Sequence, residues 1–330
     1  MGRAIRFAVP VLTGVALVAA ACHTSSADVV RVDGSSTVYP LTEAVAEEYL
    51  RATPDARITV GVAGTGGGFK RFCRGEIDIA NASRPISATE LAACDEAGVS
   101  FLEIPVAYDG ITVVVHPAND WVTDLTVEEL GRLWRHEAEA SVLRWSDLRH
   151  GFPEREIRLY GAGVDSGTFD YFTEAVTGTA RDSRGDYTSS EDDNTLVQGV
   201  AGDEGALGFF GFAYFEENRT RLRAVPIRLT SDARPVAPTV ETIRTGAYRP
   251  LSRPVFVYVS AAAFTRADVE AFIAFYLAHV GVLARDVGYV PLSDDTAGQV
   301  LARVRARTRG SIYDAGDMAG RTLDERLGTR

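Results

Sequence analysis

The chain has few of the residues on which metal-dependent and hydrolytic enzymes rely. Its 330 residues include five histidines and three cysteines. None of the histidines stands in a recognisable triad context, and no histidine accompanies the acidic run at 191–194. A hydrolase built on a catalytic triad or on a histidine-rich metal cluster is therefore disfavoured.

Basic residues are also scarce relative to acidic ones. Lysine and arginine number 34 against 45 aspartates and glutamates, which gives a formal net charge of −11. Nucleic acids and anionic membrane surfaces reward dense positive charge, so neither is expected as a partner. A small anion remains compatible with an acidic chain, because salt screens distant charges over roughly 8–10 Å and local dipoles with one arginine can dominate.

The N-terminus lacks an apolar run long enough to span a membrane. The run from Phe7 to Val18 falls short of the roughly 20 residues that cross a bilayer. Arg3 and Arg6 precede this run, and three alanines follow it at 19–21. This order is typical of a secretory signal, so we expect residues 1–21 to be a signal peptide and the chain to be exported.

Cys22 follows the three alanines and precedes a polar stretch at 23–26. The pattern resembles a bacterial lipoprotein cleavage site, although Ala19 stands where that pattern prefers leucine. The resemblance implies that Cys22 is the lipidated first residue of the mature chain, held in the periplasm or on the outer surface of the cell membrane, with 22–27 as a linker. Ordinary signal cleavage nearby is the alternative.

The other two cysteines, Cys73 and Cys94, form an even pair in an exported chain. An oxidising compartment favours a disulfide between them, which is worth roughly 3 kcal/mol for a loop of about twenty residues. Two buried free thiols are the alternative. No other histidine or cysteine lies close enough to this pair in the sequence to indicate a zinc site.

Strand-like and helix-like segments alternate after the signal. The segments 29–32, 57–62 and 77–80 are rich in apolar and β-branched residues, and helix-like stretches separate them. This alternation predicts an α/β fold with mostly parallel sheets, and the length favours two domains. If the β-branched runs 111–115 and 255–259 both cross between lobes, the chain makes two sheet domains around a cleft, the first of them discontinuous.

Three clusters of glycine and hydroxyl residues, at 34–37, 64–68 and 165–168, each stand just ahead of a helix-like stretch. A helix N-terminus offers backbone N–H groups without intrahelical acceptors and the positive end of a dipole. Three such ends in one chain predict convergence on one small anion. Taken singly, each cluster is also explained by a plain helix cap or a turn. The candidate ligands are Ser36, Thr37, Thr65, Ser166, Gly167 and Thr168.

Charged candidates stand at the ends of two other predicted strands. Ser83 is a further candidate phosphate-binding residue. Its neighbour Arg84 can give a bidentate pair to a tetrahedral oxyanion, and a surface salt bridge is the alternative role of Arg84. Asp109 stands at a strand–loop boundary. A carboxylate can accept the proton of phosphate but repels fully ionised sulfate, so Asp109 is a candidate for discrimination between the two anions.

Two patterns suggest an enzyme. The stretch 61–70 resembles a P-loop, but its Lys70 is not followed by the serine or threonine that a P-loop requires. Ser166 resembles a serine nucleophile, but the preceding 161–163 does not make a nucleophile elbow. A secreted phosphatase with Ser166 as its nucleophile remains as an alternative function.

The clusters, in this order, resemble those of the phosphate-binding lipoproteins of bacterial ABC importers. The segments that carry the resemblance are Asp33–Pro40, Thr65–Lys70, Ala82–Ile86, Asp165–Phe169 and Gly288–Leu292. The family implies an α/β, two-lobed periplasmic-binding-protein fold of type II, with two hinge crossings and lobes that close over the anion. On that template, lobe 1 takes 28–110 and 256–330, and lobe 2 takes 111–255.

The same resemblance assigns roles to the clusters. Ser36, Thr37 and Thr65 match phosphate ligands of the first lobe, and 166–168 match the helix N-terminus of the second lobe. The chain departs from the family at Ala162, where many members carry an arginine, and at Ser83, where many carry a proton-accepting aspartate. We expect Arg84 and Asp109 to supply these two charges from neighbouring positions.

The function implied by the resemblance is that of a receptor rather than an enzyme. A monomer would capture inorganic phosphate outside the membrane and deliver it to an ABC permease and ATPase complex, with no cofactor or metal. A binding protein for another oxyanion, such as sulfate, molybdate or tungstate, is one alternative. A surface adhesion or signalling module that keeps the fold is another.

Overall fold

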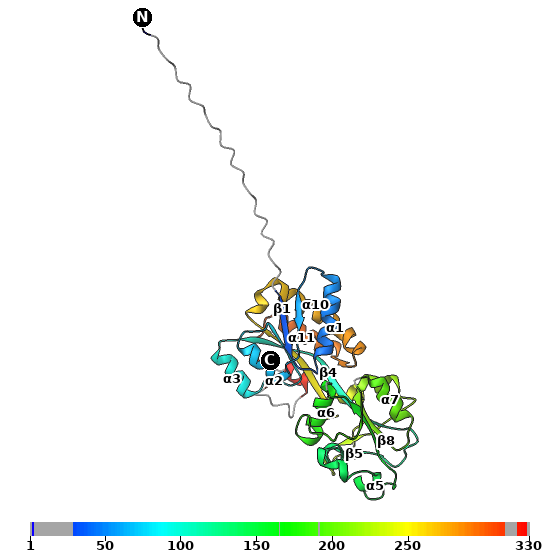
Figure 1. Cartoon of the computed structure of the whole chain (residues 1–330). Helices are drawn as coiled ribbons and strands as arrows, with labels where there is room; N and C mark the ends of the chain where they lie inside the picture. Colours follow the sequence, from blue (N-terminus) through cyan, green and yellow to red (C-terminus); the bar gives the residue numbers. More distant parts are fainter. Residues whose placement is uncertain (1, 3–28, 165, 191, 314–321, 329–330) are drawn as a thin grey trace.

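The computed structural model describes residues 2, 29–164, 166–190, 192–313 and 322–328. Apart from Gly2, the predicted signal peptide lies outside the described residues, as do the linker 22–27 with Cys22 and Asp165 of the third cluster. The described chain folds into two lobes that are joined by long strands (Figure 1).

Lobe 1 is a twisted sheet with helices on both sides. The strands lie in the order β2-β1-β3-β11-β4, and β12 adds to β4. The elements of lobe 1 alone are β1 (Val30–Gly34), α1 (Tyr39–Ala52), β2 (Ile58–Val60), α2 (Thr65–Cys73), β3 (Ile79–Ala82), α3 (Ala88–Glu96), η2 (Ala263–Thr265), α10 (Ala267–Asp286), β12 (Val290–Pro291), α11 (Asp294–Arg305) and α12 (Leu323–Gly328).

Lobe 2 continues the same sheet in the order β4-β8-β6-β7, with β9 on β4 and a separate pair β10-β5. Its elements are β5 (Leu125–Thr126), α4 (Val127–Trp134), η1 (His136–Ala140), α5 (Trp145–Leu148), β6 (Arg158–Ala162), α6 (Gly167–Thr177), β7 (Thr188–Ser190), α7 (Asp193–Ala201), β8 (Ala206–Gly211), α8 (Phe212–Glu217), β9 (Arg223–Ala224), β10 (Ile227–Arg228) and α9 (Val240–Arg244). Phe172 of α6 stacks on Phe209 of β8 with ring centroids 3.8 Å apart, which holds α6 on the sheet.

Two strands cross between the lobes, and they pair with each other. β4 (Phe101–Val115) is buried along its whole length, since its first part pairs with β11 (Ser252–Ser260) and its last part pairs with β8. The β-branched runs at 111–115 and 255–259 lie in these two strands, and the predicted boundary at 255/256 falls within β11.

The prediction of mostly parallel sheets was wrong, because the sheet is mixed. Parallel pairs form within each lobe, as between β1 and β3 and between β6 and β8. The crossing strands run in opposite directions, since one leaves lobe 1 and the other returns to it. β11 is therefore antiparallel to both β3 and β4, and β4 is antiparallel to β8.

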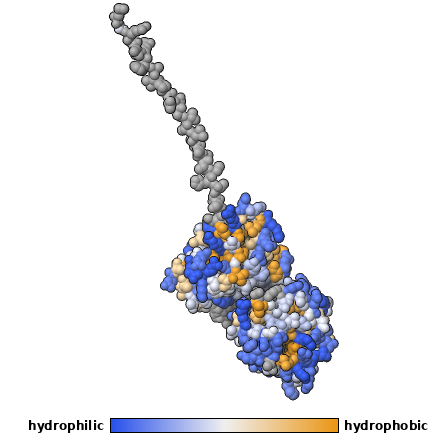
Figure 2. Space-filling model, viewed as in Figure 1, coloured by the Kyte–Doolittle hydropathy of each residue, from blue (hydrophilic) through white to orange (hydrophobic). Residues whose placement is uncertain are grey.

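The molecular surface is mainly polar on the face shown in Figure 2, where hydrophilic residues cover most of both lobes. Apolar residues are interspersed among them, and some gather over the middle of the upper lobe. Most apolar side chains lie inside, in one continuous core that runs through both lobes and includes Tyr258 in lobe 1 and Trp134 in lobe 2.

Cys73 of α2 and Cys94 of α3 form a disulfide that joins two helices of lobe 1. The bond closes a loop between residues 21 positions apart, so its main effect is to restrict the unfolded chain.

We expect the double variant Cys73→Ser/Cys94→Ser to lose about 3 kcal/mol of unfolding free energy, measured by urea denaturation under oxidising conditions. A reducing agent should lower the stability of the wild type to that of the variant; equal stability of both proteins before reduction would contradict the prediction.

Candidate anion-binding site

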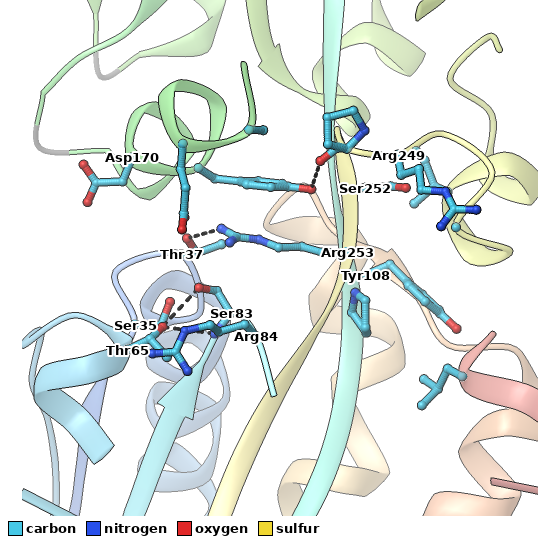
Figure 3. A pocket seen from close by; sticks show the side chains of 18 of the residues that line it. Ser35, Thr37, Thr65, Ser83, Arg84, Tyr108, Asp170, Arg249, Ser252 and Arg253 are labelled. Carbon is cyan, nitrogen blue, oxygen red and sulfur yellow. Dashed lines mark hydrogen bonds between the residues drawn. The ribbon is translucent and has the colours of Figure 1, made fainter. Parts of the chain in front are cut away.

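A cavity of about 690 Å³ lies where the two lobes and the crossing strands meet (Figure 3). Lobe 1 lines it with Ser36, Thr37, Thr65 and Ser83, among other residues. Lobe 2 contributes residues of α6, and β11 contributes Arg253. The cavity is therefore shared by the two lobes, so a ligand bound in it would contact both of them.

The first cluster lies in the turn between β1 and α1. Its backbone is fixed on both sides, since Ser35 N donates to Asn81 O at 2.9 Å and the Tyr289 hydroxyl donates to the carbonyl of Thr37. α1 begins at Tyr39 without a side-chain cap. The hydroxyls of Ser36 and Thr37 are thus not used as helix caps, and both residues line the cavity.

The second cluster opens α2, which also begins without a side-chain cap. The Thr65 hydroxyl lies 3.1 Å from the Ser83 hydroxyl and accepts a bond from Ser83 N at 3.2 Å, so the ends of two elements meet in the cavity wall. Part of the glycine run has a packing reason. A Cβ on Gly68 would lie 2.6 Å from the Cα of Gly34, so glycine lets α2 approach the first cluster closely.

The third cluster begins α6 of lobe 2 and lies directly against the first cluster. Thr37 Oγ1 donates to Gly167 O at 3.3 Å, and a Cβ on Gly167 would lie 2.5 Å from Thr37 N. The Ser166 hydroxyl caps the helix by accepting from Thr168 N at 3.2 Å. The structure thus brings all three clusters together, although among the described residues of α6 the cavity wall is formed by positions further along the helix, such as Tyr171.

Arg84 lines the cavity, but its guanidinium is already paired within lobe 1. Its two terminal nitrogens donate to the carboxylate of Glu90 at 2.8 and 2.9 Å, and one of them also donates to Pro85 O. Glu90 belongs to the capping box of α3, so its position is fixed. This is the salt bridge of the alternative interpretation, and it leaves Arg84 with a balanced charge at the edge of the cavity (Figure 3).

The positive charge that faces the first cluster belongs instead to Arg253 of β11, which the sequence analysis did not select. Its side chain is only 10% exposed, and its Nη2 donates to Thr37 Oγ1 at 3.2 Å. Its guanidinium carbon lies 3.4 Å from the ring centroid of Tyr171, whose hydroxyl donates to Pro250 O at 2.6 Å. Arg253 therefore contacts both lobes from the strand that connects them (Figure 3).

Arg253 could have been found from one sequence signal. It directly precedes a proline and the β-branched run 255–259, at a point where the expected crossing strand enters lobe 1. An arginine inside a connector between buried strands is rarely left without a partner. The two prolines at 250 and 254 predict only a connecting segment there.

Asp109 lies behind Arg253 rather than on the cavity wall. It stands opposite Arg253 in the β4–β11 register, and its Oδ2 is 3.7 Å from Arg253 Nε. Neither of these two buried atoms has a hydrogen-bond partner among the described residues. Burial raises the pKa of Asp109, while the Arg253 guanidinium opposes that rise. Asp109 is not among the residues that line the cavity, so in this structure its carboxylate faces Arg253 and not the space where an anion would bind.

The chain is similar to known proteins over both lobes. A family model described as PBP superfamily domain matches residues 19–279. Protein SphX of Synechococcus elongatus is 46% identical over 298 residues, 90% of this chain and 88% of that protein. Phosphate-binding protein PstS of Staphylococcus saprophyticus is 35% identical over 266 residues, 80% of each chain. The crystal structure of a possible phosphate binding protein from Planctomyces limnophilus matches with a TM-score of 0.82 at 45% identity, covering 86% of this chain and 100% of that one.

The contact between Gly167 and Thr37 can be tested by adding one methyl group. We expect Gly167→Ala to hold the lobes apart, because the new Cβ would meet the backbone of Thr37 at 2.5 Å. Overpacking of this kind costs about 1–3 kcal/mol, which weakens anion binding by about 5- to 150-fold. Small-angle scattering with saturating phosphate measures the separation and calorimetry the affinity.

The matched control is Gly281→Ala in α10, where nothing lies within 4 Å of the added Cβ. This control should bind and close as the wild type does. Unchanged closure and affinity in Gly167→Ala would show that the lobes do not meet at this contact.

Proposed function

The chain belongs to the family of SphX and the phosphate-binding protein PstS within the PBP superfamily, and we propose that it is an extracytoplasmic receptor for inorganic phosphate. It delivers phosphate to an ABC permease and ATPase complex and acts by binding, without turnover. The lobes that close over the ligand are 28–110 with 256–330 and 111–255.

One observation carries this proposal: three donor-rich clusters from separate parts of the chain meet beside one buried guanidinium. Thr37 lies at the centre of this arrangement, since it contacts both Gly167 and Arg253. Hydroxyls and backbone N–H groups at helix ends hold an oxyanion by directed hydrogen bonds, and one guanidinium adds charge. The proposed phosphate-binding residues are Ser36, Thr37, Thr65, Ser83, Ser166, Gly167, Thr168 and Arg253.

The binding mechanism follows from the position of the site between the lobes. Phosphate first meets the hydroxyls of lobe 1, and closure then brings the N-terminus of α6 and the Tyr171 ring over it. Closure removes water from around the anion, which strengthens each hydrogen bond in the site. Arg84, paired with Glu90, shapes the cavity edge without giving its charge to the ligand.

The role of the hydroxyls can be tested at Thr65. We expect Thr65→Val to weaken phosphate binding about tenfold, because a hydrogen bond to a charged group is worth about 1.5–3 kcal/mol. Thr59→Val, at an exposed position of β2, is the matched control and should bind as the wild type does. Isothermal titration with phosphate gives both affinities. An unchanged affinity in Thr65→Val would remove Thr65 from the site.

The same titration decides between this function and its alternatives. The wild type should bind phosphate in preference to sulfate, molybdate and tungstate, and a preference for any of these would identify a receptor for another oxyanion. Hydrolysis of a generic phosphomonoester that is abolished by Ser166→Ala would instead support a secreted phosphatase. Absence of binding to every anion would leave the adhesion or signalling module.

We also propose that the receptor is a monomer tethered through a lipid on Cys22. In the full chain expressed in a bacterium, Cys22→Ser should move the protein from the membrane fraction to the soluble extracytoplasmic fraction. Mass spectrometry of the wild-type N-terminus should show a lipidated Cys22. An unmodified alanine or serine at the mature N-terminus would contradict the anchor while leaving phosphate binding untouched.

A further inference from the structure

Asp109 and Arg253 form a buried charge pair at the point where both crossing strands pass from one lobe to the other. The two residues stand directly opposite each other in the β4–β11 register. Their side chains are both about nine-tenths buried, and Oδ2 of Asp109 lies 3.7 Å from Nε of Arg253. This distance brings the charges together while leaving both atoms without a hydrogen-bond partner among the described residues.

The Arg253 guanidinium has more N–H donors than the hydrogen bond to Thr37 uses. Arginine has five N–H donors, and the structure gives one terminal nitrogen of Arg253 to Thr37. Stacking on Tyr171 fixes the plane of the group without using any donor. Its Nε side turns to Asp109, so the carboxylate and an anion in the cavity act on the same guanidinium from different directions.

A buried guanidinium without a counter-charge is unfavourable, and a buried carboxylate is equally so. In the empty receptor, Asp109 therefore stabilises the charge of Arg253. A bound anion supplies a second negative charge to the same group, and Asp109 then repels that anion through the strand pair. A second carboxylate on the cavity edge, Asp170, pairs mainly with Arg181, since its Oδ1 lies 3.4 Å from Arg181 Nε, and it also interacts electrostatically with Arg253.

We infer that Asp109 is a positioning residue that acts as the internal counter-anion of Arg253 and competes with the bound oxyanion for its charge. This inference rests on the proposed function, and it explains how a receptor that binds phosphate can also release it. The carboxylate keeps Arg253 in place while the cleft is empty, and it limits the affinity of the closed cleft so that phosphate can leave. Asp109 accordingly lowers the affinity for every oxyanion to the same degree and does not distinguish phosphate from sulfate by the proton that phosphate carries.

The test is Asp109→Asn, which keeps the shape of the side chain and removes its charge. We expect binding of both phosphate and sulfate to tighten by about tenfold, with the ratio of the two affinities unchanged. Slower phosphate dissociation in stopped-flow fluorescence should account for most of the gain. Asp55→Asn, which removes one negative charge at an exposed position that does not line the cavity, is the matched control and should change either affinity less than twofold.

Each other result overturns the inference. A loss of phosphate affinity together with a gain for sulfate would make Asp109 a direct acceptor of the ligand proton. Unchanged or weaker binding of both anions would mean that Asp109 does not compete for Arg253. Asp109→Ser, with thermal unfolding recorded for every variant, repeats the test if the asparagine variant does not fold. Failure of the wild type to bind phosphate would reject the proposed function, whereas the variant-to-wild-type ratio measured with sulfate still decides the role of Asp109.

Discussion

The pairing of β4 with β11 is the constraint on which the rest of the structure depends. Both strands leave one lobe and enter the other, and their backbone hydrogen bonds run across the junction. β4 is buried along its whole length there, whereas Arg253 and Pro254 of β11 are partly buried and line the cavity. Asp109 and Arg253 stand opposite each other at this junction, and their opposite charges lie close together in a mostly buried environment.

From this junction the lobes converge on a single residue. Thr37 donates to Gly167 of lobe 2, accepts from Arg253 of β11, and is held from behind by Tyr289. Each of these contacts depends on a different segment of the chain, so the environment of Thr37 is complete only when the lobes are together. An acidic protein can present a positive site to an anion in this way, because helix ends and one guanidinium act over a few ångströms while salt screens the distant carboxylates.

At two of the predicted site residues, the charge of the side chain is paired within the protein. Arg84 was selected for its position beside a strand end, and it does lie at the cavity, but Glu90 six residues later takes its charge. Asp109 was selected as a direct ligand, and it lies next to the site but behind Arg253. In both cases the sequence predicts a residue that lies at or next to the cavity, while the tertiary structure decides which oppositely charged side chain it pairs with. The mixed sheet is also a consequence of the tertiary structure. β4 leads from lobe 1 to lobe 2 and β11 leads back, so the two strands run in opposite directions.

The sequence by itself determined the alternation of strands and helices, the two crossing runs and the three helix-end clusters, because these are local patterns of hydrophobicity, glycine and hydroxyl groups. It also contained the order of motifs that identifies the family. Only the tertiary structure decided which charge faces the cavity. The pairing of Asp109 with Arg253 joins residues 144 positions apart through the register of two strands, and no local pattern encodes a register between distant segments.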